Sequence, residues 1–439
     1  MRSLVLRADG GPGIGVGHLA RCLALAEAWV DRGGVATLVS DSPPPHWARR
    51  FRSEGVEVRA PGTSPLGGDW VVVDGYHLGS VRPEAGCRLL VVDDHGQAGT
   101  AEGAHLVVDQ NLGATAGPYG GARDVRLGPR YALLRREFRL RRDEVQRDQP
   151  DHATRLVVAI GGAPVQRDTQ MVTTALADPR LAHFTVTRLE GVDDVASVLA
   201  GADLALSGSG STSWELCCMG VPAVLVPLAA NQAPLAAALA RAGIALAATR
   251  DDDLAGLVAD LAHDPARRRT MAGRGRALVD GRGARRVVTR MVSESLDLRP
   301  VTEADARRLW EWANDPATRA ASFTSDPIPW ETHADWLRRR LADPASHLFI
   351  TDIGVVRFEG AVISVTVAPS ARGKGLGAAL IDAGVRRLFA TTDTPAIVAH
   401  IRPENVASHI AFADADFTPS GDHYERRRDG DRAPCLTSP

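Results

Sequence analysis

The stretch Arg7-Ala-Asp-Gly-Gly-Pro-Gly-Ile-Gly-Val-Gly-His18 decides the predicted fold of the first part of the chain. The apolar residues 3–8 predict a short buried strand, and the apolar spacing over residues 19–26 predicts a helix that packs on a sheet. Glycines in such a turn let the backbone approach a ligand closely, and the helix N-terminus directs unpaired N–H groups at it. This strand, turn and helix therefore predict an anion-binding site.

His18 adds a titratable group to that turn. Because the dipole at a helix N-terminus disfavours imidazolium, we expect His18 to stay neutral and basic near pH 7. We interpret it as a general base beside a bound anion. The alternative is a dinucleotide-type turn with an incidental histidine.

Composition limits the classes of function. The length of 439 residues predicts about three domains, and 44% hydrophobic with 24% charged residues is typical of a soluble globular protein. A net charge of −2 favours neither a nucleic-acid nor a membrane-surface partner, and no apolar run is long enough to cross a bilayer. Five cysteines without CxxC spacing, and a start without a signal-peptide pattern, predict reduced thiols in a cytoplasmic protein.

Strand-like and helix-like segments alternate along most of the chain, which predicts an α/β fold with parallel sheets. A charged segment at residues 135–148 is a candidate connector, after which the alternation restarts. Two doubly wound domains in tandem place a ligand cleft at the carboxyl ends of their strands. The predicted domains are residues 1–140, 152–295 and 296–428.

The second predicted domain carries a Gly/Ser turn, Ser207-Gly-Ser-Gly-Ser-Thr-Ser-Trp-Glu215, between a strand and a helix. Hydroxyls and exposed N–H groups suit a diphosphate. Glu215 lies in the first helical turn, where it can accept hydrogen bonds from ribose hydroxyls or simply complement the helix dipole. Two amides, Asn231 and Gln232, follow the next strand.

These motifs together resemble a known family. The string Arg-Ala-Asp-Gly…Ile-Gly-x-Gly-His-x-x-Arg-Cys-Leu-x-Leu-Ala, with Gly210-Ser-Thr-Ser-Trp-Glu…Asn231-Gln232, is similar to the UDP-sugar hydrolases of pseudaminic acid biosynthesis. These enzymes remove UDP from UDP-2,4-diacetamido-2,4,6-trideoxy-β-L-altropyranose. Further similar pieces are Val73-Asp74-Gly-Tyr76-His77, Asp93-Asp94, Asn111 and residues 127–138, so the resemblance covers about the first two thirds of the chain. Gly161-Gly-Ala-Pro164 departs from the expected small polar and acidic residues after the glycine pair.

The resemblance implies two Rossmann-like domains of the GT-B type and an inverting hydrolase. In this hypothesis His18 deprotonates the water that attacks the anomeric carbon, and helix N-termini stabilise the departing UDP without a metal. Tyr76 and His77 position the sugar, or alternatively only pack a strand end. Asp93-Asp94 is the weak metal candidate, because adjacent carboxylates usually point two ways. The predicted substrate-binding residues are Asp9, Gly15, Gly17, Arg21, His77, Tyr131, Gly161, Gly162, Ser209, Gly210, Ser211, Thr212, Glu215, Asn231 and Gln232.

In the third domain an alternating strand at residues 361–368 precedes Arg372-Gly-Lys-Gly-Leu-Gly377 and a helix from Ala378. The loop lacks the Ser/Thr of a Walker sequence and resembles the pyrophosphate loop of GNAT acetyltransferases, with Asn405-Val-Ala-Ser408…Phe417 as the second GNAT motif. Asp416 replaces the glycine usual there. The resemblance implies acetyl-CoA as co-substrate, bound by Val367, Arg372, Gly373, Lys374, Gly375, Leu376, Gly377, Asn405 and Ser408.

The aromatic segment at residues 309–336 looks like the GNAT branch that N-acetylates amino sugars carried on UDP, although core packing explains part of it. Tyr424 is a candidate general acid for the CoA thiolate. Residues 348–358 are shorter than the paired strands usual in this family, so we expect a trimmed central hairpin.

We therefore predict a bifunctional enzyme, a UDP-sugar hydrolase fused to an N-acetyltransferase, that performs consecutive steps on one nucleotide sugar. Two alternatives remain. One is a GT-B glycosyltransferase that passes the sugar from a UDP donor to an acceptor. The other is a nucleotide-sugar-binding sensor with a degenerate acetyltransferase module. Release of free UDP without an acceptor would separate the three.

Overall fold

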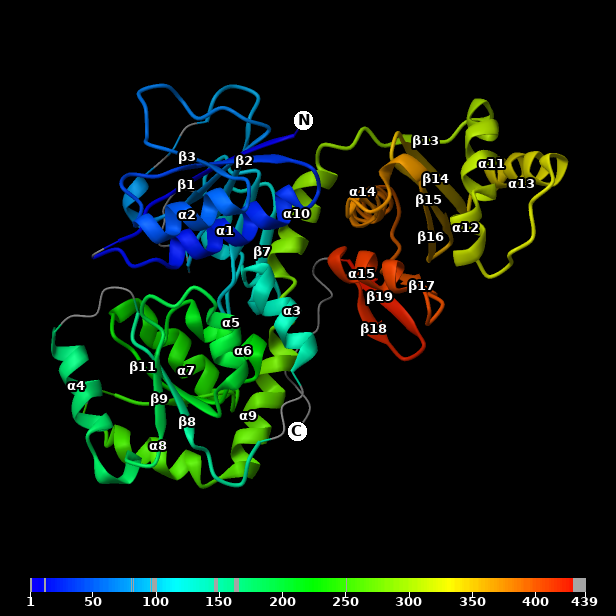
Figure 1. Ribbon diagram of the computed structural model, residues 1–439. Helices are drawn as coiled ribbons and strands as arrows, with labels where there is room; N and C mark the ends of the chain where they lie inside the picture. The colour runs from blue at the N-terminus through cyan, green and yellow to red at the C-terminus, as the bar shows by residue number, and fades with distance from the viewer. Residues whose placement is uncertain are drawn as a thin grey trace. The chain divides into compact units, whose positions relative to one another are not determined.

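The computed structural model describes residues 2–11, 13–79, 81, 83–94, 96, 101–145, 149–161, 166–249 and 251–428 (Figure 1). The chain divides into two compact units, Met1–Ala284 and Arg285–Pro439. The first unit contains two parallel sheets, and the second contains one mixed sheet. The predicted α/β class, with two Rossmann-like sheets followed by a third α/β domain, is confirmed.

The first sheet has the strand order β3-β2-β1-β4-β5-β6-β7, and every neighbouring pair is parallel. Its strands are β1 (Ser3–Ala8), β2 (Val35–Val39), β3 (Glu57–Arg59), β4 (Trp70–Asp74), β5 (Arg88–Val92), β6 (Leu106–Asp109) and β7 (Val125–Leu127). The helices are α1 (Gly17–Val30), α2 (Pro45–Ser53) and the short turns η1 (Tyr76–Leu78), η2 (Gly117–Tyr119) and η3 (Pro129–Tyr131). Every residue of β4 is buried, as expected for a parallel strand covered on both faces.

The second sheet has the order β12-β11-β10-β8-β9 and is also parallel throughout. Its strands are β8 (Arg155–Ala159), β9 (Thr185–Arg188), β10 (Leu204–Gly208), β11 (Ala223–Val226) and β12 (Leu246–Ala247). The helices are α4 (Gln166–Leu176), η4 (Pro179–Leu181), α5 (Val195–Gly201), α6 (Thr212–Met219), η5 (Ala230–Gln232), α7 (Ala233–Arg241), α8 (Leu254–Ala262) and α9 (Pro265–Leu278). One apolar cluster, which includes Leu156, Leu204, Trp214 and Val224, fills the space between this sheet and its helices.

The charged segment predicted as a connector contains helix α3 (Arg136–Glu144), which packs against α5 and α6. Three arginine–carboxylate contacts hold its start, because Arg136 reaches Asp31 and Glu54 while its backbone N–H donates to Glu27 at 2.6 Å. The connector is therefore a packed helix and not an open linker.

The second unit holds the order β13-β14-β15-β16-β17-β19-β18, antiparallel except for the parallel pair β16 and β17. The strands are β13 (Arg299–Pro300), β14 (Ser346–Thr351), β15 (Gly354–Glu359), β16 (Val362–Val367), β17 (Ala396–Ala399), β18 (Thr418–Ser420) and β19 (His423–Arg427). The helices are α10 (Gly283–Ser293), whose first two residues belong to the first unit, η6 (Glu303–Asp305), α11 (Ala306–Asn314), α12 (Pro316–Ala321), α13 (Trp330–Ala342), η7 (Pro369–Ala371), α14 (Leu376–Thr391) and α15 (Val406–Asp414).

The hairpin expected to be short consists of β14 and β15, and it is complete over its own length. All six residues of β14 pair with β15, and all six of β15 pair with β16. Two-residue turns at Asp352-Ile353 and Gly360-Ala361 join these strands, so a short sequence still gives a complete ladder. Helix α14 also begins two residues before Ala378, because Gly375 in the left-handed conformation precedes it as N-cap.

Candidate active site

The carboxyl ends of β1 and β4 form the centre of the site. These strands are neighbours in the first sheet, and the chain runs outward from them on both sides. In a doubly wound sheet this switch point is where ligands bind. Asp9 follows β1, Asp74 ends β4, and the glycine-rich turn returns from β1 to the start of α1.

His18 pairs with Asp74 at this point. The imidazole Nδ1 lies 2.6 Å from Asp74 Oδ1, and His18 is 8% exposed while Asp74 is fully buried. When Nδ1 carries the proton it donates to the carboxylate, and the lone pair on Nε2 is then free to accept a proton from water. This is the orientation that a carboxylate imposes on the histidine of a catalytic pair.

Arg21 fixes Asp74 in turn. Its Nε donates to Asp74 Oδ2 at 2.8 Å, its Nη2 donates to Oδ1 at 2.6 Å, and its Nη1 contacts Asp94 Oδ2 at 3.1 Å. Burial opposes the charge of Arg21, but Asp74 and Asp94 outweigh it and raise the Arg21 pKa. Arg21, predicted to bind substrate, thus directs its donors at two carboxylates, and its Nη2 also lies 2.9 Å from His18 Nδ1.

Tyr76 and Asn111 both donate to Asp94, Asn111 Nδ2 at 2.6 Å from Oδ1. Burial acts to raise the pKa of Asp94, but Arg21, Tyr76 and Asn111 outweigh it and lower that pKa to about 2. Burial and the Asp94 charge raise the pKa of Tyr76, so its hydroxyl remains a hydrogen-bond donor. The Tyr76 ring also meets the His18 ring edge to face, with 5.3 Å between centroids.

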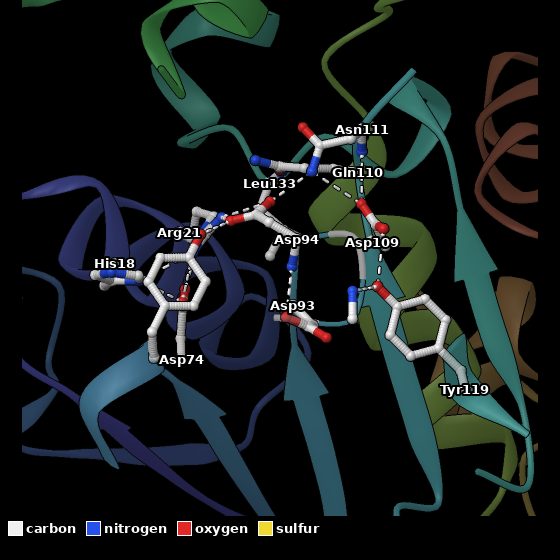
Figure 2. Close-up of polar contacts among 12 residues, drawn as sticks. His18, Arg21, Asp74, Asp93, Asp94, Asp109, Gln110, Asn111, Tyr119 and Leu133 are labelled. Carbon is white, nitrogen blue, oxygen red and sulfur yellow. Dashed lines mark hydrogen bonds and ion pairs between the residues drawn. The ribbon is translucent and has the colours of Figure 1, made fainter. Parts of the chain in front are cut away.

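The network continues away from His18, as Figure 2 shows. Asn111 Nδ2 also donates to Asp109 Oδ1 at 2.9 Å, and Tyr119 donates to Asp109 Oδ2 at 2.8 Å. Asp93 and Asp94 point apart (Figure 2), and Asp93 accepts from the Asp94 backbone N–H. The roles of Asp74, Asp94 and Asn111 were missed by sequence reasoning, although their positions just at or after strand ends were a signal that could have found them.

Asp9 and His77 form a second pair beside the first. His77 Nε2 lies 2.9 Å from Asp9 Oδ2, and Asp9 Oδ1 accepts from Arg7 at 2.6 Å and from the Asp41 N–H at 2.7 Å. Burial acts to raise the pKa of Asp9, but these hydrogen bonds lower it to about 2. The His77 side chain is 43% exposed, so it can contact a ligand while Asp9 holds it.

The glycine-rich turn lies beside the corresponding turn of the second sheet. Gly15 has φ +81°, which favours glycine, and a Cβ added to Gly17 would stand 3.1 Å from Ser211 Oγ. His18, the second residue of α1, therefore lies close to the predicted diphosphate turn.

That second turn joins β10 to α6 as predicted, with Ser209, Gly210 and Ser211 before Thr212, the first helical residue. Gln232 Oε1 accepts from the N–H groups of Ser209 at 3.2 Å and Leu228 at 3.0 Å, so Gln232 ties two strand-end loops together.

Glu215 lies in the first turn of α6, and Arg135 Nη2 is 3.3 Å from Glu215 Oε1. Burial raises the pKa of Glu215 although Arg135 opposes this. Of the other predicted nucleotide contacts, Asn231 is exposed, whereas Tyr131 is only 1% exposed. Gly161 has φ +87°, and Gly162 lies outside the described residues.

The predicted cofactor loop follows β16. Gly373 and Gly375 have φ of +73° and +63°, and Lys374 Nζ donates to the Ser370 carbonyl at 2.9 Å. Arg372 does not point freely outward, because it donates to Asp315, to Thr318 Oγ1 at 2.7 Å and to the Val367 carbonyl at 3.3 Å. Leu376 begins α14, and a Cβ on Gly377 would lie 3.2 Å from Val367 Cγ2.

Asn405 is the N-cap of α15 and accepts from the Ser408 N–H at 3.1 Å. Tyr424 lies on β19 opposite Ala399, with its hydroxyl 3.1 Å from His409 Nδ1. The second GNAT motif, through Asn405 and Ser408, therefore fixes the start of α15, and His409 of this helix contacts Tyr424, the candidate general acid.

Among the residues that the structure describes, no group of three or more His, Cys, Asp or Glu side chains lies in a position to hold a metal ion. No helix within the described part of the chain has the length and apolar character needed to cross a membrane.

Two segments of the chain match known protein families. Residues 139–280 match the glycosyltransferase family 28 C-terminal domain, and residues 295–418 match the acetyltransferase (GNAT) domain. No curated protein matches the chain closely enough to serve as a relative.

Among solved structures, Acinetobacter baumannii MurG is similar at 18% identity and TM-score 0.45, over 66% of this chain and 98% of that one. An aminoglycoside acetyltransferase AAC(6')-Ib solved with coenzyme A is similar at 21% identity and TM-score 0.27, over 30% and 95%. Vibrio cholerae spermidine N-acetyltransferase, solved with CoA and spermine, is similar at 18% identity and TM-score 0.28, over 30% of this chain and 94% of that one. The two family matches indicate an enzyme in which a glycosyltransferase-like domain is fused to a GNAT acetyltransferase domain.

Proposed function

We propose that this enzyme hydrolyses a UDP-2,4-diacetamido-trideoxyhexose to the free sugar and UDP, and N-acetylates the UDP-4-amino precursor from acetyl-CoA. The observation that carries the hydrolase proposal is the His18–Asp74 contact of 2.6 Å at the switch point of the first sheet. A histidine oriented in this way can deprotonate water directly.

The chemistry follows from the contacts. His18 Nε2 takes a proton from water, whose oxygen attacks the anomeric carbon, and the bond from that carbon to the UDP oxygen breaks with inversion. The N–H groups at the start of α6 and the hydroxyl of Ser211 would stabilise the diphosphate, whereas the buried Ser209 hydroxyl donates to the Gln232 carbonyl at 3.0 Å. Tyr76 and His77 lie beside His18 and Asp9 and would position the sugar. The proposed hydrolysis uses no metal.

In the second unit, acetyl-CoA would bind along Val367, Arg372–Gly377, Asn405 and Ser408, with the N–H groups at the start of α14 facing its diphosphate. The amine of the sugar attacks the thioester carbonyl and loses a proton to water, the carbon–sulfur bond breaks, and CoA leaves as the thiolate that Tyr424 would protonate. This half of the proposal is supported by the GNAT match at residues 295–418.

The match of residues 139–280 to a glycosyltransferase family also favours a second candidate, in which the sugar is transferred from UDP to an acceptor. The test is incubation with UDP-diamino sugars, with and without acetyl-CoA, followed by NMR. We expect free sugar and UDP without any acceptor, and a rate lower by about 10²–10⁴-fold in His18→Asn with UDP binding retained. UDP release only after an acceptor is added would favour the transferase, and near-normal hydrolysis by His18→Asn would refute this role for His18.

A further inference from the structure

In the second unit, one face of the sheet changes from apolar to polar at Arg357. Strand alternation places Val355 and Arg357 on the same face of β15. Val355 packs in the apolar cluster with Leu309 of α11 and Leu337 of α13, so this face meets those helices. Arg357 thus brings a guanidinium to the edge of a hydrophobic core.

The contacts of Arg357 are all to neutral groups. Its Nε donates to Ser364 Oγ at 3.1 Å, its Nη2 donates to Thr366 Oγ1 at 3.4 Å, and its carbon Cζ lies 5.6 Å from the centroid of the Trp336 ring. Within the described residues no carboxylate forms an ion pair with it, and the nearby Glu359 pairs with Arg340 at 2.8 Å. A guanidinium offers five donors, and only two are used here.

The surroundings add positive charge. Arg319 and Arg340 act on Arg357 as like charges, whereas the Glu359 carboxylate favours its charged form. Arg319 itself donates to the Ala313, Thr324 and Asp326 carbonyls and to the Ser322 hydroxyl. Two arginines therefore lie here among neutral partners.

His333 is a further polar group close to Arg357. It is 4% exposed, and within the described residues its Nε2 has no hydrogen-bond partner. Its ring packs on Trp336, with 5.4 Å between centroids. Burial and the Arg357 charge lower its pKa, so it is neutral and adds no compensating charge.

We infer that Arg357, with Trp336, Ser364 and Thr366 around it, binds a phosphate group of the acetyl acceptor. A partly buried guanidinium without an ion-pair partner is costly, and a phosphate supplies both the negative charge and the missing acceptors. Arginine suits phosphate because its planar fork donates two parallel hydrogen bonds. This inference rests on the proposed function, and it adds that the domain selects a nucleotide-linked amine over a neutral or cationic one.

The position of Arg357 separates this site from the predicted cofactor loop. Arg357 pairs with Ser364 in the β15–β16 ladder, whereas the loop with its own N–H donors begins only after Val367. Acetyl-CoA binding should therefore not depend on Arg357.

The test is a calorimetric titration of the full chain with UDP, in the presence of saturating CoA, for the native protein, Arg357→Gln and Arg338→Gln. Arg338 lies on α13 and pairs with Asp335 on the surface, so it is a matched control. We expect one class of UDP site to weaken by about tenfold or more in Arg357→Gln and to stay unchanged in Arg338→Gln. Uridine, which lacks phosphate, should bind all three proteins alike.

Identical UDP titrations of the native protein and Arg357→Gln would overturn the inference. Acetyl-CoA affinity, measured on the same samples, shows whether the acetyltransferase domain of each variant is folded. It also tests the proposed acetyl transfer independently of the phosphate site. If acetyl-CoA binds and UDP titrations are identical, only the phosphate site is refuted. If acetyl-CoA does not bind the native protein, the proposed acetyl transfer fails whatever Arg357 does.

Discussion

At the scale of single residues, Asp74 links most of the candidate site. Its Oδ1 contacts His18 and accepts a hydrogen bond from Arg21, and its Oδ2 accepts from Arg21 alone. Arg21 also contacts Asp94, so Asp74 belongs to a network that surrounds His18. A change at Asp74 therefore acts through the orientation of His18 and not through a direct contact with the substrate. Asp74 is thus a positioning residue in the proposed hydrolysis.

The first prediction concerns Asp74→Asn. An amide can present its N–H₂ to His18 and favour the tautomer in which Nε2 carries the proton, so the base is lost while the shape is retained. We expect kcat for UDP-sugar hydrolysis to fall by roughly 10²–10⁴-fold, with UDP affinity changed little. Steady-state kinetics and UDP calorimetry measure the two quantities.

A structural defect would give a different result. Asp69→Asn is a suitable control, because Asp69 also lies just before β4 but its side chain accepts from the Ser3 N–H and hydroxyl near the surface, away from His18. If Asp74→Asn hydrolysed as fast as Asp69→Asn across pH 5–9, the His18–Asp74 pair would have no catalytic function.

At the scale of elements, the pattern of apolar residues was enough to place the strands. The predicted strand at residues 3–8 is β1, and the predicted helix over residues 19–26 lies within α1. Parallel strands buried on both faces give continuous apolar runs, which can be recognised without knowledge of their neighbours.

Which strands are neighbours could not be predicted in the same way. His18 and Asp74 are 56 residues apart, and they meet only because β4 pairs with β1 and not with β3. Likewise Glu215 was predicted at a helix start, but its partner Arg135 lies 80 residues earlier. Sequence thus predicted residues at strand ends, whereas the pairs they form depend on long-range topology.

The contact between α1 and α3 gives a prediction about pH. Glu27 of α1 is 2% exposed and accepts from the Arg136 N–H at the start of α3. Burial raises the pKa of Glu27 to about 7. Since the pKa in the unfolded chain is about 4.3, the folded state binds more protons between these values, and stability falls as pH rises from about 4.5 to 7.

Glu27→Gln keeps an oxygen for the Arg136 N–H and removes the buried charge. We expect this variant to match the native free energy of unfolding near pH 5 and to exceed it by about 2–3 kcal/mol at pH 8. Urea unfolding at the two pH values measures the difference. Glu57→Gln, at an exposed position on β3, should show no such change, and a parallel pH dependence for the native protein and Glu27→Gln would contradict the prediction.

The loop between β16 and α14 gives a prediction for the second unit. Gly375 is in the left-handed conformation as N-cap of α14, where a β-branched residue is strained and crowds the approach of a diphosphate. We expect Gly375→Val to abolish acetyl-CoA binding in calorimetry. Gly360→Val introduces the same strain at φ +57° in the β15–β16 turn, and it should retain binding. Equal loss in both variants would assign the effect to strain alone.

At the scale of the whole molecule, the fusion combines two units that each carry a complete predicted site. His18, Asp74 and the Ser209–Thr212 turn lie in Met1–Ala284, and Arg357, Arg372–Gly377 and Tyr424 lie in Arg285–Pro439. Neither proposed reaction requires a residue from the other unit. The two activities should therefore be separable, and consecutive steps on one nucleotide sugar need only release and rebinding of the intermediate.

The last prediction is where the chain can be cut. Most of α10 belongs to the second unit, because Arg285 donates to the buried Asp414 at 2.7 Å and Ser293 donates to Asp382 of α14, which also pairs with Arg426 at 2.7 Å. The predicted boundary near residue 296 would remove both α10 contacts. A fragment of residues 285–439 should bind acetyl-CoA, and it should unfold at a higher temperature than residues 296–439, since the shorter fragment lacks the contacts of α10 with Asp414 and Asp382. Thermal unfolding of the two fragments with and without acetyl-CoA decides this, and equal midpoints would show that α10 contributes nothing to the fold of the acetyltransferase domain.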